Sequence, residues 1–224
     1  KSLRKNKTKV FLGNTPIDKI ISKKIDYTMS AVVGLAGLQP TIDAIKNSNT
    51  VAIANKETVI CGWDILSKFI KKYKTKVLPV DSEHFSIMEL TKNIEESEVE
   101  EIIITASGGP FLNIKKSKLK NIKPKQAINH PNWKMGKKIS TDSANLMNKV
   151  FEVIEACKIF NFNEKKYRIV IHPQSYVHSI IRFKNGLIKM ILYNTDMKIP
   201  ISNILFGKKN YLKNVSNVDL KKLN

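Results

Sequence analysis

Two acidic residues, Asp81 and Glu83, directly follow a short apolar run at residues 77–80. The run is typical of a buried strand. If the chain stays extended beyond it, the two-residue period of a strand puts both carboxylates on one side. Carboxylates are costly to bury unless they are paired or bound to a metal. Oxygen ligands of this kind suit Mg²⁺ or Mn²⁺, so the pair is a candidate half of a metal site; the alternative is an ordinary acidic turn.

A long helix is predicted at residues 141–160, with Ser140, Thr141 or Asp142 as its cap. The apolar residues that we expect on its core side are Leu146, Met147, Val150, Val153, Ile154 and Cys157. The opposite face carries Asn145, Asn148, Lys149, Glu152 and Glu155. Because asparagine lowers helix propensity without a packing gain, this face indicates groups presented to a ligand. The alternative is a solvated face with a weak Lys149–Glu152 ion pair.

Two loops add further candidate ligand-binding groups. Ser107 and two glycines follow a strand expected at residues 102–105, and small residues there leave main-chain N–H groups able to face a phosphate. A tight turn uses the same residues. In the loop at residues 130–136, Trp133 and Met135 stand among Pro, Gly and Lys without apolar periodicity. Such a loop is either a lid that excludes water or a surface loop held by one buried tryptophan.

The elements that must position these residues alternate along the first half of the chain. Strands are predicted at residues 29–34, 51–54, 77–80 and 102–105, and helices at 38–47, 56–73 and 87–98. This order predicts a parallel α/β sheet, whose ligands bind outside the carboxyl ends of the strands. Further along, a strand at residues 167–172 precedes a hairpin of 176–183 and 187–193 around Asn185-Gly186. The fold class is therefore α/β: a partial Rossmann-like parallel sheet followed by an α+β domain with a mixed sheet.

Composition narrows the class of protein. The 224 residues are 42% hydrophobic, which is enough for a sizeable core, and no apolar run is long enough to span a bilayer. Cys61 and Cys157 give neither metal spacing nor a disulfide framework. The net charge of +20 makes nucleic-acid binding a function to consider. However, apart from a cluster at residues 1–9, the lysines are spread along the chain, and no aromatic residues alternate with them to stack on bases. A lysine-rich composition or an anionic small substrate explains the charge equally well. A short strand at residues 10–13 and a polar segment at 207–224 complete the predicted elements.

Several motifs, in a fixed order, carry a resemblance to a known family. They are Ala54-Asn55-Lys56-Glu57, Asp81-Ser82-Glu83-His84, Ser107-Gly108-Gly109-Pro110-Phe111, His130-Pro131-Asn132-Trp133-Lys134-Met135-Gly136, Asp142-Ser143 with Asn148-Lys149 and Glu152, and His172-Pro173-Gln174-Ser175-Tyr176-Val177-His178-Ser179. Together they resemble the 1-deoxy-D-xylulose 5-phosphate reductoisomerase family across residues 27–206. The motifs are long, ordered and rare. The alternative, another NADPH- or metal-dependent sugar-phosphate enzyme on a similar scaffold, would explain the α/β half but not the loop at residues 130–136 and the motif at 172–179 together.

The chain also departs from that family's pattern. No Gly-rich dinucleotide fingerprint opens it, and the family's helical C-terminal domain does not follow the sheet, so the chain looks like a fragment with low NADPH affinity of its own. The segment between Glu83 and Ser107 is shorter by about ten residues, a usual size for a variable loop. Val150 and Thr195 stand where the family commonly has Gly and Pro.

The resemblance implies an activity and its cofactors. The family converts 1-deoxy-D-xylulose 5-phosphate to 2-C-methyl-D-erythritol 4-phosphate in the non-mevalonate isoprenoid pathway. It uses NADPH and a divalent metal, Mg²⁺ or Mn²⁺, with Co²⁺ as a further candidate. The resemblance also implies a homodimer without nucleic-acid or membrane partners. Its setting would be the bacterial cytoplasm, or a plastid or apicoplast in a eukaryote.

The resemblance further implies a role for individual residues. The metal ligands are Asp81, Glu83 and Glu152, which with His178 in the substrate pocket form the catalytic set. The substrate-binding residues are Ser82, Glu83, Ser107, His130, Trp133, Ser143, Asn148, Lys149 and Glu152. The cofactor-contacting residues are Asn55, Lys56, Glu57, Met135 and Met197. Residues 1–79 are then the C-terminal part of an NADPH-binding domain, and residues 80–224 a metal-binding catalytic domain.

Overall fold

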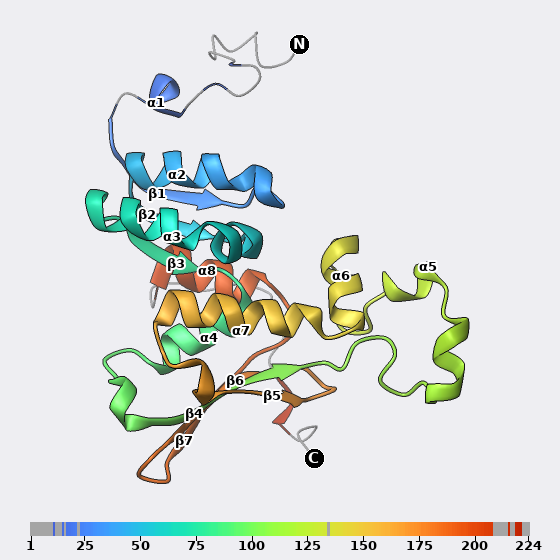
Figure 1. Cartoon of the computed structure of the whole chain (residues 1–224). Helices are drawn as coiled ribbons and strands as arrows, with labels where there is room; N and C mark the ends of the chain where they lie inside the picture. The colour runs from blue at the N-terminus through green and yellow to red at the C-terminus, as the bar shows by residue number, and fades with distance from the viewer. Residues whose placement is uncertain are drawn as a thin grey trace. The chain divides into compact units, whose positions relative to one another are not determined.

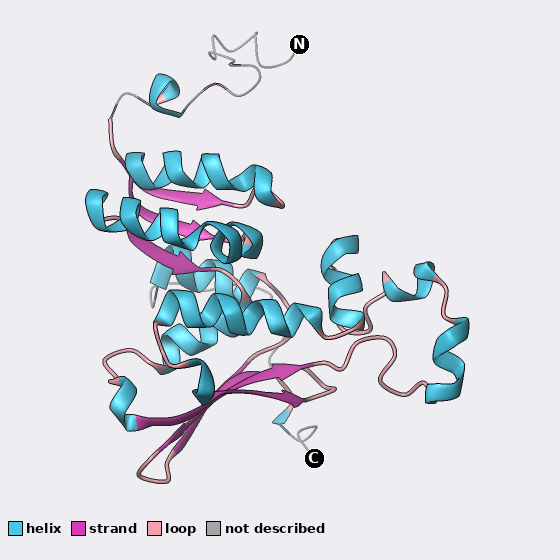
Figure 2. Cartoon of the chain, viewed as in Figure 1, coloured by secondary structure: helices cyan, strands magenta, loops and turns pink. Residues whose placement is uncertain are grey.

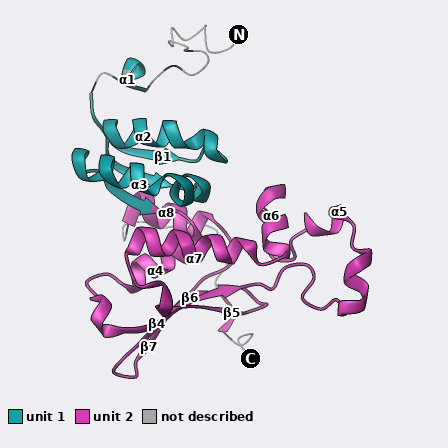
Figure 3. Ribbon diagram, in the orientation of Figure 1, with its two compact units in different colours: residues 1–78 teal, residues 79–224 magenta. Residues whose placement is uncertain are grey.

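The computed structural model describes residues 11, 15, 17–21, 23–133, 135–207, 215 and 218–220. The chain divides into two compact units, Lys1–Leu78 and Pro79–Asn224 (Figure 3). Apart from Phe11, the strand predicted at residues 10–13 lies outside the described residues, as do the lysine cluster at 1–9 and most of the segment 207–224. Within the described part of the chain, no helix has the length and apolar character needed to cross a membrane.

The first unit holds a three-stranded sheet with helices beside it. Its strands are β1 (Ile25–Ser30), β2 (Ser48–Ile53) and β3 (Lys76–Pro79), in that order, and β1 pairs with β2 in parallel. The helical elements are α1 (Ile17–Ile20), the short 3₁₀ turn η2 (Leu35–Gly37), α2 (Leu38–Asn47) and α3 (Lys56–Tyr73). Val51, Ala52 and Ile53 of β2 are fully buried or nearly so, which explains why the second half of this strand is apolar.

The second unit holds a mixed four-stranded sheet in the order β5-β4-β6-β7 (Figures 1 and 2). Its strands are β4 (Val99–Ala106), β5 (Tyr167–Ile171), β6 (Val177–Phe183) and β7 (Ile188–Leu192). β4 pairs in parallel with β5 and antiparallel with β6, and β6 and β7 form the predicted hairpin. Gly186 takes a φ of 85° in the turn of that hairpin, which glycine adopts without strain. The α/β class with a parallel sheet and a mixed sheet is thus confirmed.

Helices α4 and α7 cover one face of this mixed sheet (Figure 1). The helical elements of the unit are α4 (Ser82–Leu90), η3 (Glu96–Glu98), η4 (Lys116–Asn121), α5 (Pro124–Ala127), α6 (Lys137–Ala144), α7 (Met147–Phe160), η5 (Glu164–Lys166) and α8 (Lys198–Phe206). Ile87 of α4 and Ala156 of α7 join Ile102, Ile104 and Ile181 of the strands in one buried apolar cluster. This packing fixes the two helices that carry the acidic residues.

Two predicted helices have other bounds than expected. The helix predicted at 87–98 begins at Ser82 and ends at Leu90, because the Asp81 side chain caps it by accepting hydrogen bonds from the main-chain N–H of Glu83 (3.0 Å) and His84 (3.4 Å). The helix predicted at 141–160 is two helices, α6 and α7. They are separated at Leu146, whose φ of 64° is left-handed and incompatible with a continuing helix.

The prediction of which face of α7 is buried was wrong. Its polar residues are buried: Asn148, Lys149, Glu152 and Glu155 are 8%, 7%, 1% and 2% exposed. The apolar residues Leu146, Met147, Val150 and Ile154 are 37% to 43% exposed. Of the six residues predicted on the core side, Val153 and Cys157 pack against the apolar cluster. Helical periodicity separates two faces but does not say which one is buried. Here the polar face is buried because its charges are matched by partners on α4.

Candidate metal centre and its surroundings

Three carboxylates converge between α4 and α7. Asp81, Glu83 and Glu152 each offer one oxygen, and these oxygens all lie within 4.8 Å of one another. The strand-period argument for Asp81 and Glu83 was wrong, because the chain turns into α4 at Ser82. The two carboxylates instead come from the N-cap and the first turn of that helix, and Glu152 reaches them from α7. A cluster of three carboxylates is the type of oxygen-donor set that Mg²⁺ or Mn²⁺ prefers.

Two of the three carboxylates, Glu83 and Glu152, are held by Lys149 and Asn148 of α7. The Lys149 ammonium donates to Glu83 Oε1 (2.6 Å) and to Glu152 Oε2 (2.7 Å), and the Asn148 amide donates to Glu152 Oε1. Burial lowers the pKa of Lys149, but the charges of Glu152 and Glu83 outweigh burial and hold that pKa well above its usual value. One ammonium against three carboxylates leaves a local excess of two negative charges. A divalent cation would balance this excess, so the residues present fit such an ion.

A buried histidine links the two helices at this centre. His84 Nδ1 lies 2.9 Å from Asp81 Oδ1, and Nε2 lies 2.9 Å from the main-chain oxygen of Glu152. Both partners accept hydrogen bonds, so both ring nitrogens carry protons when both bonds form. Burial alone would lower the pKa of His84, but the charges of Glu155 and Asp81 outweigh burial and raise it to about 9.

This histidine predicts how the stability of the metal-free chain depends on pH. The pKa of His84 is raised from 6.5 to about 9, so between these values the folded chain binds more protons than the unfolded chain. The stabilisation is complete below pH 6.5 and is lost as the pH rises through 9. We expect the free energy of unfolding to fall by up to about 3 kcal/mol across this interval, measured by urea unfolding in a chelating buffer. A stability that is flat or rises over the same interval would contradict the doubly protonated ring.

The predicted phosphate-binding residues come from three segments of the second unit. Ser107, in the loop after β4, accepts a hydrogen bond from Gly109 N (3.1 Å), and its Oγ lies 2.9 Å from His130 Nε2. Gly109 has a φ of 68°, and a Cβ there would lie 2.8 Å from the main-chain oxygen of Ser143, so only glycine lets the loop approach α6 this closely. Burial lowers the pKa of His130, and the charge of Lys149 lowers it further, which favours a neutral imidazole.

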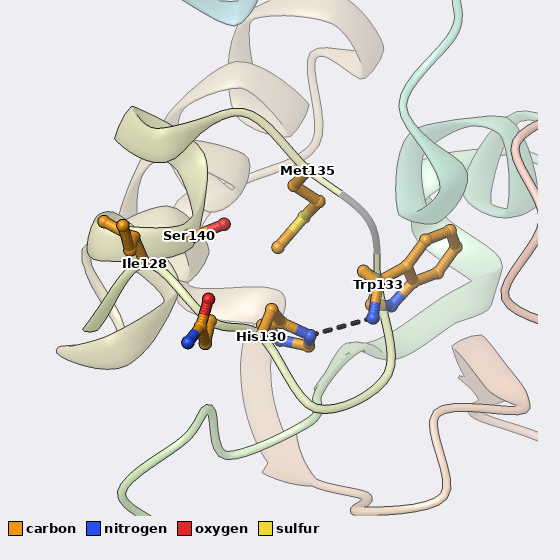
Figure 4. Close-up of a pocket in the computed structure, with 6 residues that line it drawn as sticks. Ile128, His130, Trp133, Met135 and Ser140 are labelled. Carbon is orange, nitrogen blue, oxygen red and sulfur yellow. Dashed lines mark hydrogen bonds between the residues drawn. The ribbon is translucent and has the colours of Figure 1, made fainter. Parts of the chain in front are cut away.

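The Trp133 loop surrounds a pocket of about 600 Å³ (Figure 4). The pocket is lined by Ile128, Asn129, His130, Trp133, Met135 and Ser140. His130 Nδ1 accepts hydrogen bonds from the main-chain N–H of Trp133 (3.0 Å) and Asn132 (3.1 Å), so the imidazole shapes the start of the loop. The Trp133 ring meets His178 edge-on, with ring centroids 5.9 Å apart. His178 in turn stacks on Tyr193 at 3.8 Å, and burial lowers its pKa. Lys134 lies outside the described residues.

The predicted cofactor residues are divided between the two units. Asn55 is the N-cap of α3 and is buried: its Oδ1 accepts from Thr58 N (3.0 Å) and its Nδ2 donates to the oxygens of Gly34 (2.8 Å) and Val32. This amide therefore holds the turn before α3. Lys56 and Glu57 form the first turn of that helix, whereas Met135 and Met197 belong to the second unit. Their contacts with a cofactor stay predictions.

Sequence reasoning missed three residues that support the carboxylate centre. Glu155 was placed only on the polar face of its helix, and His84 was given no role, although His84 follows Asp81 by three residues, the spacing at which helical side chains meet. Tyr193 was assigned only to a strand end, yet its hydroxyl donates to the main-chain oxygen of Ser82 (2.8 Å). No local pattern in the sequence brings residue 193 to residue 82.

The fold and this centre define a class: an α/β protein with a carboxylate site suited to a divalent cation, beside serine, histidine and lysine groups suited to an anion. Comparison with known families narrows the class. A sequence model described as the 1-deoxy-D-xylulose 5-phosphate reductoisomerase C-terminal domain matches residues 77–160, and one described as 1-deoxy-D-xylulose 5-phosphate reductoisomerase matches residues 1–62. The chain belongs to the 1-deoxy-D-xylulose 5-phosphate reductoisomerase family.

Individual relatives agree with this placement. The chain is 52% identical to the 1-deoxy-D-xylulose 5-phosphate reductoisomerase of Pelagibacter ubique, with 100% of the chain and 58% of the relative covered. It is 41% identical to the protein of the same name from Thermoanaerobacter pseudethanolicus, with 97% of the chain and 57% of that relative covered. The chain therefore spans little more than half the length of these curated relatives.

Solved structures give the same result for the fold. A reductoisomerase crystallised with NADPH, fosmidomycin and magnesium superposes with a TM-score of 0.81 at 37% identity, covering 88% of this chain and 51% of that one. The Zymomonas mobilis enzyme in complex with NADPH superposes with a TM-score of 0.79 at 38% identity, with the same coverage.

Proposed function

We propose that this chain is part of an enzyme that isomerises and reduces 1-deoxy-D-xylulose 5-phosphate to 2-C-methyl-D-erythritol 4-phosphate. The enzyme would use NADPH and a divalent metal. The observation that carries the proposal is the convergence of Asp81, Glu83 and Glu152 within 4.8 Å. Family membership supports it, as do the relatives solved with NADPH and with magnesium.

The three carboxylates are the proposed metal ligands. Asp81 and Glu83 come from the start of α4 and Glu152 from α7, so two rigid elements fix their separation. A bound Mg²⁺ or Mn²⁺ supplies Lewis-acid stabilisation of the oxygens whose charge changes during the rearrangement. Ser82, whose hydroxyl donates to Glu83 Oε2, is proposed to contact substrate oxygens beside the metal.

The phosphate-binding group is proposed to hold the phosphate of the substrate. It consists of Ser107, His130, Ser143, Asn148 and Lys149. The hydroxyls and the amide supply directed hydrogen bonds, and the ammonium supplies charge. The same Lys149 lies against two of the carboxylates, so the phosphate and metal positions adjoin. Holding the phosphate fixes the reacting carbons and lowers the entropic part of the barrier.

The Trp133 loop is proposed to close over the bound substrate and exclude water. Trp133 contacts His178, which we place beside the reacting carbons. The buried imidazole of His178, with Trp133 packed against it, is proposed to line the substrate pocket. Its ring face would contact apolar parts of the substrate, and one ring nitrogen would form a hydrogen bond. Met135 and Met197, with Asn55, Lys56 and Glu57, are proposed to contact NADPH, residues 1–79 being part of the cofactor domain and 80–224 the catalytic domain. We further propose a homodimer in the bacterial cytoplasm, which light scattering and cell fractionation would test.

The activity is tested on the protein as its gene encodes it. We expect NADPH to be consumed only when 1-deoxy-D-xylulose 5-phosphate and Mg²⁺ or Mn²⁺ are both present. A chelator should stop the reaction, and 2-C-methyl-D-erythritol 4-phosphate should be the product found by mass spectrometry. NADPH consumption without the sugar phosphate, or none with all components present, would reject the proposal.

A substitution at Ser107 tests the phosphate-binding group. Ser107→Ala removes one hydroxyl from the phosphate contacts, and hydrogen bonds to charged groups contribute about 1.5–3 kcal/mol. We therefore expect KM for the sugar phosphate to rise about 10- to 100-fold, with a much smaller change in kcat. Ser117→Ala, an exposed serine of η4, is the matched control. Equal KM values for the two variants would remove Ser107 from the phosphate site.

A further inference from the structure

Glu155 is a buried carboxylate that the proposed reaction does not use. It lies on α7 three residues after Glu152 and is 2% exposed. Among the described residues, the carboxylates close enough to share a metal ion are Asp81, Glu83 and Glu152, and Glu155 is outside that group. Its Oε2 instead lies 3.7 Å from His84 Nε2. A carboxylate buried this completely needs a partner, and the His84 ring lies within ion-pair distance of it.

Both hydrogen bonds of the His84 ring end on residues of the carboxylate centre. Nδ1 reaches Asp81 Oδ1, and Nε2 reaches the main-chain oxygen of Glu152, each at 2.9 Å. One ring therefore ties the N-cap of α4 to the turn of α7 that carries Glu152. The ring is fully buried, and it stacks on Phe160 with ring centroids 6.2 Å apart, so it has little freedom to turn.

One oxygen of Asp81 bonds both to this ring and to the main chain of α4. Asp81 Oδ1 accepts from the main-chain N–H groups of Glu83 and His84 as well as from His84 Nδ1. The ring thus fixes the plane of the Asp81 carboxylate about the same oxygen that caps the helix. Some residues hydrogen-bond to metal ligands without touching the metal. Removing such a residue typically lowers the metal affinity 10- to 100-fold.

We propose that Glu155 is a positioning residue of the metal centre: it holds the His84 ring, and the ring fixes Asp81 and the main chain at Glu152 in their chelating arrangement. This inference rests on the metal site in the proposed function. Glu155 and His84 form a pair behind the ligands and touch neither metal nor substrate. The competing explanation is that the pair only packs α4 against α7.

The test measures the binding of Mn²⁺ to the purified 224-residue chain. Binding is monitored through the decrease in the EPR signal of free Mn²⁺. Glu155→Gln keeps the size of the side chain and removes its charge. We expect the Kd for Mn²⁺ to rise about tenfold or more. Ala156→Gly is the matched control, because Ala156 is the next residue of α7 and its side chain is fully buried in the apolar cluster. Its Kd should stay within about twofold of the unsubstituted chain, at a comparable loss of thermal stability.

The outcomes separate the two proposals. If the unsubstituted chain fails to bind Mn²⁺, the metal centre and the positioning pair are both rejected. If it binds and Glu155→Gln binds equally well, or no worse than Ala156→Gly, only the positioning role is rejected. Should Glu155→Gln fail to fold, Glu155→Asp keeps the charge but withdraws it by one methylene. An Mn²⁺ affinity of Glu155→Asp equal to that of the unsubstituted chain would then overturn the proposal.

Discussion

Replacing Glu152 by glutamine is expected to abolish metal-dependent turnover while leaving the fold intact. Glutamine has nearly the same shape, and its one carboxamide oxygen still accepts a hydrogen bond from Lys149 or Asn148, which between them bond to both oxygens of Glu152. It lacks the negative charge that completes the set of three carboxylates. Loss of several kcal/mol of metal-assisted stabilisation corresponds to a fall in kcat/KM of about three orders of magnitude.

The Glu152 experiment compares steady-state rates of NADPH consumption at saturating Mg²⁺ and thermal unfolding in a chelating buffer. Glu100→Gln, which removes one carboxylate from an exposed position of β4, is the control and should keep full activity. The unfolding midpoint of Glu152→Gln should stay within a few degrees of that of the unsubstituted protein. Near-normal activity in Glu152→Gln would reject the three-carboxylate centre.

Replacing Lys149 by methionine is expected to give the largest loss of stability. Methionine fills most of the space of the lysine stem but leaves Glu83 and Glu152 without the ammonium that lies 2.6 and 2.7 Å from their oxygens. Breaking a buried ion pair in this way costs about 3–5 kcal/mol. We expect this loss in the free energy of unfolding measured in a chelating buffer.

Mg²⁺ should then stabilise the Lys149→Met variant more than the unsubstituted chain. Without the ammonium the three carboxylates keep their full negative charge, so the cation binds more tightly. A ligand present at about 100 times its Kd adds roughly 2.7 kcal/mol to the stability. Lys138→Ala, which removes an exposed ion pair with Asp142, is the control and should change stability by less than about 1 kcal/mol. If Mg²⁺ stabilises Lys149→Met no more than it stabilises the unsubstituted chain, the ammonium and the metal do not interact with the same carboxylates, and the prediction is wrong.

Local patterns predicted most of the alternating elements, although the strand predicted at residues 29–34 is β1 at Ile25–Ser30 and the helix predicted at 87–98 is α4 at Ser82–Leu90. The helices at 38–47 and 56–73 have the predicted bounds, because Pro40 in the first turn of α2 and Asn55 as N-cap of α3 mark where they begin. The hairpin of β6 and β7 followed from Asn185-Gly186. In each of these cases the signal lies within a few residues of the feature that it specifies.

The failures have a common physical cause. The strand period misplaced Asp81 and Glu83 because Asp81 caps a helix, and the carboxylate side chain, not the apolar run before it, decides the backbone there. The prediction of the buried face of α7 was wrong because a charged network between Glu83, Glu152 and Lys149 stabilises the burial of the polar side. That network joins residues more than sixty positions apart, and no window of the sequence contains both halves.

The family motifs nonetheless predicted the three carboxylates as one metal-binding set, and the structure brings these three residues together. The residues of the phosphate-binding group came from the same resemblance, and the structure brings Ser107 to His130 and the Ser107 loop to Ser143. What the motifs did not contain is the support behind the ligands. His84 lies inside one of the motifs without a role, and Glu155 lies beyond its end.

The central claim is that Asp81, Glu83 and Glu152 bind one divalent cation. The most direct measurement is anomalous diffraction from a crystal of the chain grown with Mn²⁺. We expect a single strong peak between α4 and α7, with an oxygen of each of the three carboxylates within about 2.1 Å of the ion. A crystal with Mn²⁺ bound elsewhere, or with no ion between these carboxylates at saturating Mn²⁺, would contradict the claim.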